Sequence, residues 1–496
     1  MSYYQRLKNY TITKIMVAML SMVGNSPDVV LIKFTYLAEK LAKKDYYIKI
    51  IRWIRELFQS GHPSLIVAKK ILRETHPAHM QQLVKSFFIN QLLLGTNKRK
   101  EFQDKNGFYP PGFIVISPSM LCNLKCFGCY SGNYIKDKGL SVDVIDRILY
   151  EANEMGIYFA VISGGEPFFR KDLLNVFERH KEMAFHVFTH GGLLDEKLID
   201  RIVNIGNIVP AISIEGYEED TDLRRGKGHY AAIMKAMDLL SEAGVLFGFS
   251  ATQTSKNTDT ITSDRFIDMM AEKGCTLGWF FSYCPVGREP NLDLMPRPEQ
   301  RDLLRERLKY FRSTKPILLA DFWNDGPIVG GCLAAGRRYL HINANGDIEP
   351  CVFAHYAVDN IHNTTMQEAL KSKLFTTIKD RLASGGNLYK PCMLIDRPDV
   401  WREAVFASGA RPTHEGADTL VTTLSDSMDK YAVEYGRLAN PAWEQYLKKN
   451  AEQHGCCSTD AFAERTIVPS PDHTACEEGE DVEGFLKPAC RQTGRR

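Results

Sequence analysis

Cys122-Asn-Leu-Lys-Cys126-Phe-Gly-Cys129-Tyr130 places three cysteines on one short stretch of chain. It directly follows residues 113–117, an apolar β-branched run that predicts a buried strand. Three thiolates on one loop can bind three irons of a cubane [4Fe–4S] cluster and leave the fourth iron open to a substrate or cofactor. The alternative is a zinc loop, but structural zinc takes four protein ligands, and no nearby pair of cysteines or histidines completes the set. The stretch therefore favours an iron–sulfur centre at a strand end.

Beyond this stretch, short apolar runs alternate with amphipathic helical segments. Six strands are predicted at residues 113–117, 158–163, 185–188, 208–214, 245–251 and 276–283, with helices between them at 141–155, 171–183, 195–204, 229–243 and 263–273. Strands that alternate with helices in this way form a parallel sheet. We therefore predict an α/β fold, a partial (β/α)6 barrel of the TIM type, with its active mouth at the carboxyl ends of the strands.

The length of 496 residues exceeds what a single core organises, and the composition divides the chain further. We predict five parts: a basic helical region at 1–110, the barrel at 111–325, a cysteine-containing extension at 326–395, a helical segment at 396–450 and an acidic, disordered tail at 451–496. The 62 basic and 60 acidic side chains nearly balance, which is typical of a soluble globular protein. The twelve cysteines are too sparse for a disulfide scaffold.

The N-terminal region is distinctly basic, with 18 Lys and Arg against 7 Asp and Glu in residues 1–110. Its amphipathic helices place Lys49, Arg52 and Arg55 between apolar residues. Such helices fit either peripheral contact with anionic lipid at the inner face of a membrane, or packing on the barrel with the charges solvated. The apolar run at 15–23 is too short to cross a bilayer and lacks a signal-peptide cleavage pattern, so we predict a cytoplasmic protein. No nucleic-acid partner is expected, because no reader motif accompanies the charge.

Four further motifs follow the cysteine loop in order. They are Gly164-Gly165-Glu166-Pro167, Thr189-His190-Gly191-Gly192, Ser213-Ile214-Glu215 and Asp222-Leu-Arg-Arg225-Gly226, the first three at the ends of successive predicted strands. Together with C-x3-C-x2-C, they resemble the radical S-adenosylmethionine (radical SAM) enzymes. The resemblance implies that the open iron binds the amino and carboxylate groups of S-adenosylmethionine (SAM). It also implies that the reduced cluster cleaves SAM to a 5′-deoxyadenosyl radical, which abstracts hydrogen from a substrate.

The same resemblance predicts the residues of the cofactor site. Cys122, Cys126 and Cys129 are the expected cluster ligands, and no further catalytic side chain is predicted. The expected SAM contacts are Tyr130, Gly164, Gly165, Glu166, Pro167, Thr189, Ser213, Glu215 and Arg225. Two positions depart from the family pattern. His190 replaces the usual Asn, and Gly128 stands where an aromatic residue usually precedes the third cysteine, with Phe127 one place earlier.

A second group of cysteines lies beyond the barrel. Gly331-Cys332-x13-Gly346-x4-Cys351 contains the turn signal Asn345-Gly346, which predicts a hairpin that brings two cysteines together. The arrangement resembles the first half of the SPASM/twitch auxiliary-cluster region, with Cys392 as the only further cysteine there. We expect Cys332, Cys351 and Cys392 to hold one auxiliary [4Fe–4S] cluster whose fourth ligand is missing, non-cysteine or donated by the substrate; three unligated cysteines are the alternative. Cys284, after the sixth strand, fits a cluster ligand, a radical-quenching thiol or simple packing.

The motifs leave the substrate open. Enzymes that resemble this chain commonly modify a ribosomal peptide or protein, whereas the basic N-terminal helices fit a lipid acyl chain as the substrate. We expect an oxygen-sensitive oxidoreductase or bond-forming enzyme that receives electrons from a donor such as flavodoxin or ferredoxin. The alternative is a non-catalytic iron–sulfur protein that transfers electrons or acts as a sensor.

Overall fold

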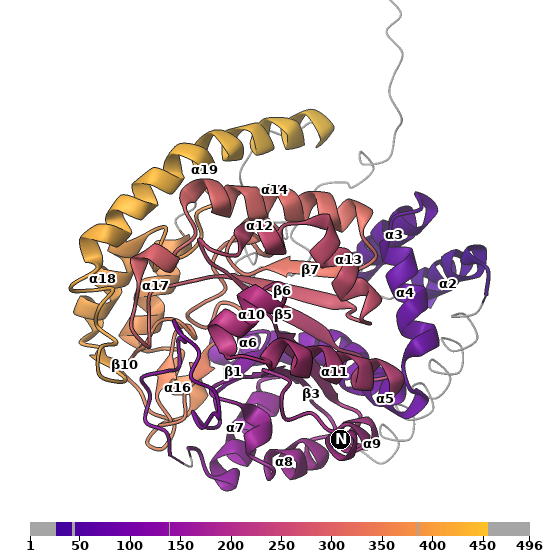
Figure 1. Cartoon of the computed structure of the whole chain (residues 1–496), viewed down its shortest axis with the longest axis horizontal. Coiled ribbons are helices and arrows are strands. Elements are labelled where there is room, and N and C mark those ends of the chain that lie inside the picture. Colours follow the sequence, from indigo (N-terminus) through magenta and orange to yellow (C-terminus); the bar gives the residue numbers. More distant parts are fainter. Residues whose placement is uncertain (1–25, 42–44, 138, 384–385, 455–496) are drawn as a thin grey trace, which may run out of the picture.

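The computed structural model describes residues 26–41, 45–137, 139–383 and 386–454, and its centre is one sheet (Figure 1). Seven parallel strands follow one another across this sheet in sequence order: β1 (Ile114–Ile116), β2 (Phe159–Ile162), β3 (Ala184–Thr189), β4 (Ile208–Ser213), β5 (Gly248–Gln253), β6 (Leu277–Ser282) and β7 (Leu318–Asp321). The predicted partial barrel is therefore confirmed. β7 was not predicted, because this short edge strand exposes Leu318 and lacks a continuous buried apolar run.

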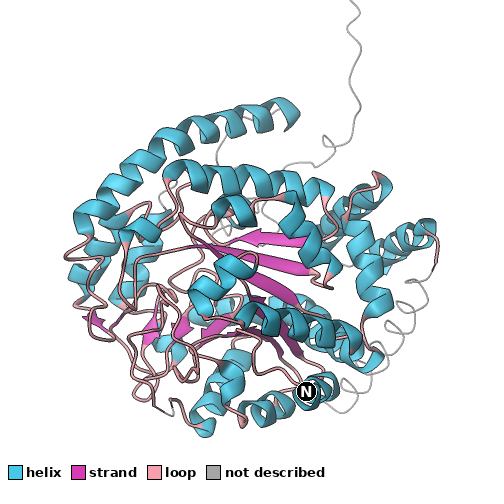
Figure 2. Ribbon diagram, in the orientation of Figure 1, coloured by secondary structure: helices cyan, strands magenta, loops and turns pink. Residues whose placement is uncertain are grey.

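Helices cover the outer face of the sheet (Figure 2). The longer ones are α7 (Val142–Glu154), α8 (Leu173–Arg179), α9 (Glu196–Ile205), α11 (His229–Glu242), α13 (Asp264–Glu272) and α14 (Pro298–Thr314). Shorter ones lie in the loops: η2 (Pro167–Phe169), α10 (Glu218–Arg225), α12 (Thr258–Ile261), η3 (Leu292–Leu294) and α15 (Gly326–Val329). The side chains of Ser141, Asp195 and Ser263 cap three of the long helices by accepting a backbone N–H in the first turn. The apolar helix faces and the sheet share one continuous core.

The cysteine-containing extension continues the same sheet. β8 (His341–Ile342) pairs in parallel with β1, and β9 (Ile348–Glu349) returns antiparallel to β8. Gly346, in the turn between them, has φ of +85°, a left-handed conformation that favours glycine. The predicted hairpin is thus present, and the two cysteine-bearing parts of the chain meet at β1.

The carboxylate of Glu349 lies at this seam and is completely buried. One of its oxygens accepts hydrogen bonds from Tyr134 Oη (2.8 Å), Asn343 Nδ2 (2.8 Å) and Thr413 Oγ1 (2.6 Å). His341 Nδ1 lies 2.6 Å from the other oxygen, and His341 Nε2 lies 2.8 Å from Ser117 Oγ. Burial acts to raise the pKa of Glu349, but His341 and the hydrogen bonds outweigh it and leave the pKa below its usual value.

The chain beyond the hairpin returns to the barrel. It forms α16 (Met366–Ala369), α17 (Lys373–Ala383), α18 (Pro398–Ser408) and α19 (Ser425–His454), with β10 (Tyr356–Ala357) paired to β11 (Arg411–Pro412). α19 runs along α14 (Figure 1), and Tyr435 of α19 stacks on Arg301 of α14 at 3.8 Å. α18 and α19 agree with the helical pattern predicted for 396–450. Most of the predicted acidic tail, residues 455–496, lies outside the described residues.

The described part of the basic N-terminal region consists of helices: α2 (Asp28–Leu41), α3 (Asp45–Gln59), α4 (Ser64–Glu74), α5 (Pro77–Leu83), the π-helix η1 (Val84–Leu94) and α6 (Gly95–Asn106). η1 covers the amino ends of the barrel strands. Its Gln91 donates to the Gly112 carbonyl before β1 (2.6 Å) and accepts from Tyr158 N before β2 (2.7 Å). Asn90 donates to the Glu182 carbonyl before β3 (2.8 Å). This part of the region therefore packs on the barrel.

α2 and α3 lie farther from the sheet (Figure 1). Arg52 and Arg55 of α3 both pair with Glu39 of α2, and Arg55 is buried with its guanidinium over the Tyr36 ring at 3.7 Å. Of the three cations noted in the sequence, only Lys49 and the partly paired Arg52 are exposed. No helix in the described ranges is both long and apolar enough to cross a membrane.

Protonation of buried histidines is expected to weaken the fold in acid. His79 of α5 is fully buried, neither ring nitrogen has a hydrogen-bond partner within the described residues, and burial lowers its pKa from 6.5 to about 4. As the pH falls, His79 takes up a proton in the unfolded chain before it does so in the folded chain. The contribution of neutral His79 to the free energy of unfolding is therefore fully present above pH 6.5 and is lost as the pH drops toward 4. We expect His79→Leu to remove about 2 kcal/mol of the stability lost between about pH 7 and pH 5, measured by urea denaturation. His362→Gln, which changes an exposed ring, is the control; an equal loss in both variants would contradict the prediction.

Candidate functional site

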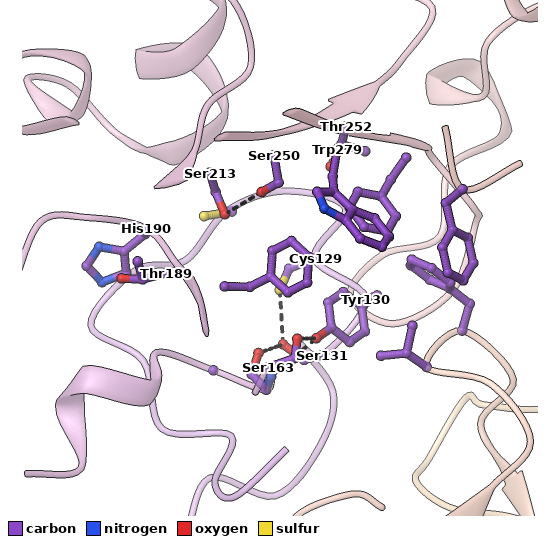
Figure 3. A pocket seen from close by; sticks show the side chains of 18 of the residues that line it. Cys129, Tyr130, Ser131, Ser163, Thr189, His190, Ser213, Ser250, Thr252 and Trp279 are labelled. Atoms are coloured by element: carbon purple, nitrogen blue, oxygen red, sulfur yellow. Dashed lines mark hydrogen bonds between the residues drawn. The ribbon is translucent and has the colours of Figure 1, made fainter. Parts of the chain in front are cut away.

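A cavity of about 200 Å³ lies at the carboxyl ends of the strands. The cysteine loop after β1 and the ends of β2 to β6 form its walls. Figure 3 shows Thr189 and His190 on one side and Trp279 on the other, with Cys129 and Tyr130 between them. Because η1 covers the amino ends of the strands, the cavity and the N-terminal helices lie at opposite ends of the barrel.

All three cysteines of the loop line this cavity. Cys122 Sγ accepts a hydrogen bond from Leu124 N (3.4 Å), and Cys129 Sγ lies 3.3 Å from Ser131 Oγ. Burial raises the pKa of Cys122 and of Cys126. A bound metal deprotonates such thiols, and hydrogen-bond donors close to the sulfurs are typical of iron–sulfur sites. The loop therefore has the donor set of an iron–sulfur cluster.

The Gly164-Gly165 pair lies against the chain that leads into the cysteine loop. Gly165 N donates to the Ser119 carbonyl (3.0 Å), and Glu166 N donates to the Leu121 carbonyl (2.8 Å). A Cβ at Gly165 would overlap the Leu121 carbonyl, and Gly164 has φ of +110°. Glycine is required at both positions because two backbones approach closely and pair there.

Glu166 lies behind the cavity wall and is buried. Its carboxylate accepts hydrogen bonds from Thr189 Oγ1 (2.8 Å), His190 N (2.8 Å) and Phe168 N (3.1 Å). Burial raises the pKa of Glu166 to about 7, although these donors act to lower it. In this structure Glu166 joins the Gly164-Gly165 loop to the end of β3.

His190 connects the end of β3 to the cysteine loop. Its Nε2 lies 2.8 Å from Asn123 Oδ1, and its Nδ1 accepts a hydrogen bond from Gly192 N (3.0 Å). Burial, with a further contribution from His229, lowers the pKa of His190 to about 3, so the ring is neutral. The residue that replaces the usual Asn thus fixes the loop segment between Cys122 and Cys126.

Two arginines supply positive charge beside the cysteines. Arg224 and Arg225 line the cavity, and both pair with the buried Glu215, at 2.7 Å and 2.5 Å. Arg224 also lies 3.4 Å from the carbonyl oxygens of Phe127 and Gly128 in the cysteine loop. Because two cations face one carboxylate, the group keeps a net positive charge suited to a carboxylate ligand.

The cysteines of the extension form a second cluster of thiols. Cys332, Cys351 and Cys392 line one narrow cleft beside the main cavity, together with Phe322, Trp323, Tyr339, Phe353 and Met393. Tyr339 Oη donates to Cys351 Sγ (2.9 Å), and Leu394 N donates to Cys392 Sγ (3.4 Å). Burial raises the pKa of all three thiols. The three expected ligands are therefore brought together.

Two family models match the chain at these two groups of cysteines. The radical SAM superfamily model matches residues 116–253, and the SPASM model, an iron–sulfur cluster-binding domain, matches residues 332–393. The chain thus contains a radical SAM domain and a SPASM domain. A radical SAM domain binds a [4Fe–4S] cluster and SAM, and a SPASM domain binds auxiliary iron–sulfur clusters.

Individual relatives are distant. Fe-coproporphyrin III synthase of Methanosarcina barkeri is 27% identical over 229 residues, 43% of this chain and 56% of that protein. PqqA peptide cyclase of Granulibacter bethesdensis is 25% identical over 261 residues, 49% of this chain and 68% of that protein. The crystal structure of Streptococcus suis SuiB bound to S-adenosylmethionine superposes with a TM-score of 0.50 at 20% identity, covering 70% of this chain and 84% of that one. This last similarity shows the shared fold.

The remaining wall of the radical SAM cavity is apolar. It consists of Phe113, Val115, Val161, Phe188, Trp279, Phe281, Phe322 and Phe353, with the hydroxyl side chains of Ser250 and Thr252 at its border. Trp279 and Phe281 are stacked with their rings 6.0 Å apart. Trp279 and Phe281 alternate along β6 with residues that face away from the cavity. This period of two was the only feature of the sequence that could have indicated that they line it. The cavity thus has a polar side at the cysteines and an aromatic side opposite.

The structure divides the predicted SAM contacts into two sets. Those that line the cavity are Tyr130, Gly164, Gly165, Thr189, Ser213 and Arg225. Glu166, Pro167 and Glu215, also predicted as contacts, are buried and do not line the cavity. Gly128 lines the cavity without contributing a ring, and a Cβ there would lie 2.7 Å from Tyr283. His190, Arg224, Ser250 and Thr252 were not predicted as lining residues. They were missed because they line the cavity only once segments distant in sequence have packed together.

Close contact between the Gly164-Gly165 loop and the cysteine loop is expected to be essential for SAM binding. Gly165→Ala places a methyl group against the Leu121 carbonyl and should push the Gly164-Gly165 loop away from the cysteine loop. We expect at least a tenfold weaker affinity for SAM, about 1.4 kcal/mol, in anaerobically reconstituted protein. The measurement is equilibrium binding of SAM, with iron content determined on the same samples. Gly112→Ala is the matched control, since its Cβ would meet only the Arg338 carbonyl at 3.8 Å. Equal affinities for the two variants would contradict this reading of the loop.

Proposed function

We propose that this protein is a radical SAM enzyme that abstracts hydrogen from an apolar group of its substrate. The observation that carries the proposal is the cavity itself, which joins the three thiols of the cysteine loop to an aromatic wall. When bound and reduced, the cluster with SAM supplies a 5′-deoxyadenosyl radical that removes a hydrogen atom. An aromatic wall can hold a hydrocarbon group by burial of apolar surface and exclude water from the reacting atoms.

The side chains of the cavity have separable tasks under this proposal. Arg224 and Arg225 face the site of the anionic part of SAM, and Glu215 keeps both guanidinium groups in place. Tyr130 Oη lies 2.5 Å from Ser163 Oγ and accepts from Gly164 N (3.3 Å), so it holds the glycine loop in contact with the cysteine loop. Burial raises the pKa of Tyr130 to about 12, so its hydroxyl stays protonated and able to donate.

A peptide or protein side chain is the substrate group that the similarity to a peptide-modifying relative favours. The relative PqqA peptide cyclase carries a peptide substrate in its name. A second candidate, a lipid acyl chain, is favoured by exposed apolar residues of the N-terminal helices, including Tyr36, Leu37 and Trp53. That surface lies at the end of the barrel away from the cavity, so a lipid held there would not reach the radical site directly.

Reductive cleavage of SAM tests the proposed activity. We expect reconstituted protein to form 5′-deoxyadenosine under anaerobic conditions with dithionite, or with reduced flavodoxin or ferredoxin, because the three thiols complete the radical SAM site. The variant Cys122→Ala/Cys126→Ala/Cys129→Ala should form none. Cys275→Ala is the matched control, since Cys275 is buried two residues before β6 and does not line the cavity. Iron-loaded wild type that binds SAM without cleaving it would instead support a non-catalytic electron-transfer or sensor protein.

Deuterium transfer distinguishes the two substrate classes. Peptide and lipid extracts from cells grown in deuterated medium are supplied separately to the reconstituted enzyme with SAM. We expect 5′-deoxyadenosine to gain one deuterium, seen by mass spectrometry, with the peptide extract, because the abstracted atom ends on the 5′-carbon. Transfer only from the lipid extract would overturn the peptide assignment and support the membrane-surface alternative. The triple cysteine variant is the blank for both extracts.

A further inference from the structure

The SPASM region of this chain supplies one thiol fewer than a cubane cluster takes. Residues 326–395 contain Cys332, Cys351 and Cys392 and no other cysteine. A [4Fe–4S] cluster is ordinarily held by four thiolates, one on each iron. A fourth ligand must therefore come from elsewhere if all four irons are to bind protein.

Cys284 is a barrel cysteine that lines the main cavity beside this cleft. It lies two residues beyond β6, is almost completely buried, and lines the main cavity beside Phe322, Tyr339 and Phe353. These same three residues also line the cleft of the SPASM cysteines. The main cavity and the cleft thus share part of their walls, and Cys284 lines the main cavity together with the shared residues.

Electrostatic contacts relate the four sulfurs in a closed ring. Burial is the main reason for the raised pKa of Cys284, and Cys351 raises it further. Cys392 interacts in the same way with both Cys332 and Cys284, and Cys351 interacts with Cys332. Neighbouring thiols of this group therefore lie within electrostatic range of one another.

An unpaired donor in the cleft points to a ligand there. Trp323 lines the cleft and is 1% exposed, and its Nε1–H has no hydrogen-bond partner within the described residues. A buried N–H without a partner is costly, whereas the sulfide and thiolate sulfurs of a cluster accept hydrogen bonds. A hydrogen-bond acceptor bound in the cleft would give the Trp323 Nε1–H the partner that it lacks.

The backbone on both sides of the cleft is firmly held. On the SPASM side, Cys392 N donates to Asp396 Oδ2 (3.0 Å), and Asp396 forms a fully buried bidentate pair with Arg301 (2.5 and 3.0 Å). On the barrel side, Val286 N donates to the Cys284 carbonyl (2.8 Å), and Tyr283 N donates to Gln253 O (2.8 Å). Such support keeps ligands in position for a metal centre.

We propose that Cys284 is the fourth protein ligand of the auxiliary cluster, completing a set with Cys332, Cys351 and Cys392. This inference rests on the proposed function only in assuming that the SPASM domain binds its cluster. It replaces the earlier expectation of a missing, non-cysteine or substrate-donated ligand. The auxiliary cluster then has no iron left open for a substrate, and it joins the wall of the radical cavity to the SPASM region.

The test isolates the auxiliary site. The background is the full chain with Cys122, Cys126 and Cys129 changed to Ala, reconstituted anaerobically, so iron bound there does not depend on SAM cleavage. We expect this background to hold about four irons per chain. Cys284→Ala in the background should lower this to about three or fewer, with the EPR spectrum of an oxidised three-iron cluster or with complete loss of the cluster. Cys275→Ala, a buried cysteine outside both cavities, is the matched control and should keep all of the iron.

A second variant keeps the result decisive if Cys284→Ala fails to fold, as judged by circular dichroism. Cys284→Ser retains an oxygen that can bind iron, so we expect it to keep the iron but shift the EPR spectrum of the reduced cluster. Unchanged iron and an unchanged spectrum in either folded variant would overturn the proposal. A background that binds no iron would also overturn it. Failure of the proposed function appears separately, as absence of 5′-deoxyadenosine from the protein with all cysteines present.

Discussion

The hydrogen-bonded carboxylate of Glu349 is the interaction on which the junction between the two cysteine-bearing regions depends. An ionised carboxylate taken out of water costs several kcal/mol unless donors surround it. Here the donors come from the cysteine loop (Tyr134), from β8 and its turn (His341, Asn343) and from the strand region near the C-terminal helices (Thr413). Satisfying one buried charge therefore fixes β1, β8 and β9 together, and it sets Cys351, two residues beyond Glu349, beside the barrel.

Buried carboxylates that are paired with hydrogen-bond donors also support the radical SAM cavity. Glu166 and Glu215, both predicted SAM contacts, are buried outside the lining of the cavity, where Glu166 accepts hydrogen bonds from the end of β3 and Glu215 pairs with two arginines. If either carboxylate faced the cavity, it would add negative charge beside a carboxylate-bearing cofactor. Keeping them behind the wall leaves the arginines, the hydroxyls and the thiols in front.

The sequence predicts those features of the fold and the site that are encoded within one short segment of the chain. The first six strands were predicted because apolar residues are concentrated in or beside each of them, and β7 was missed because Leu318 is exposed at the edge of the sheet. The glycine pair was identifiable because close backbone approach needs glycine within one short motif. The bond from His190 to Asn123 spans 67 residues and depends on how two loops pack, which no local pattern records. Likewise, the sequence offered Cys284 as a cluster ligand among other roles, but no local pattern indicates that it shares wall residues with the cleft of the SPASM cysteines.

Placing one cluster ligand on the barrel would give the auxiliary cluster a structural task. Metal binding to thiols that are spread over separate segments contributes its free energy to the assembled state alone. With Cys284 two residues beyond β6 and three further thiols in the SPASM region, that free energy would hold the end of β6 against the hairpin of β8 and β9. Trp279 and Phe281 project from β6 into the radical cavity, so the position of this strand sets the shape of the aromatic wall. The cluster would thereby stabilise the cavity in the form that a substrate meets, and it would do so without touching the substrate.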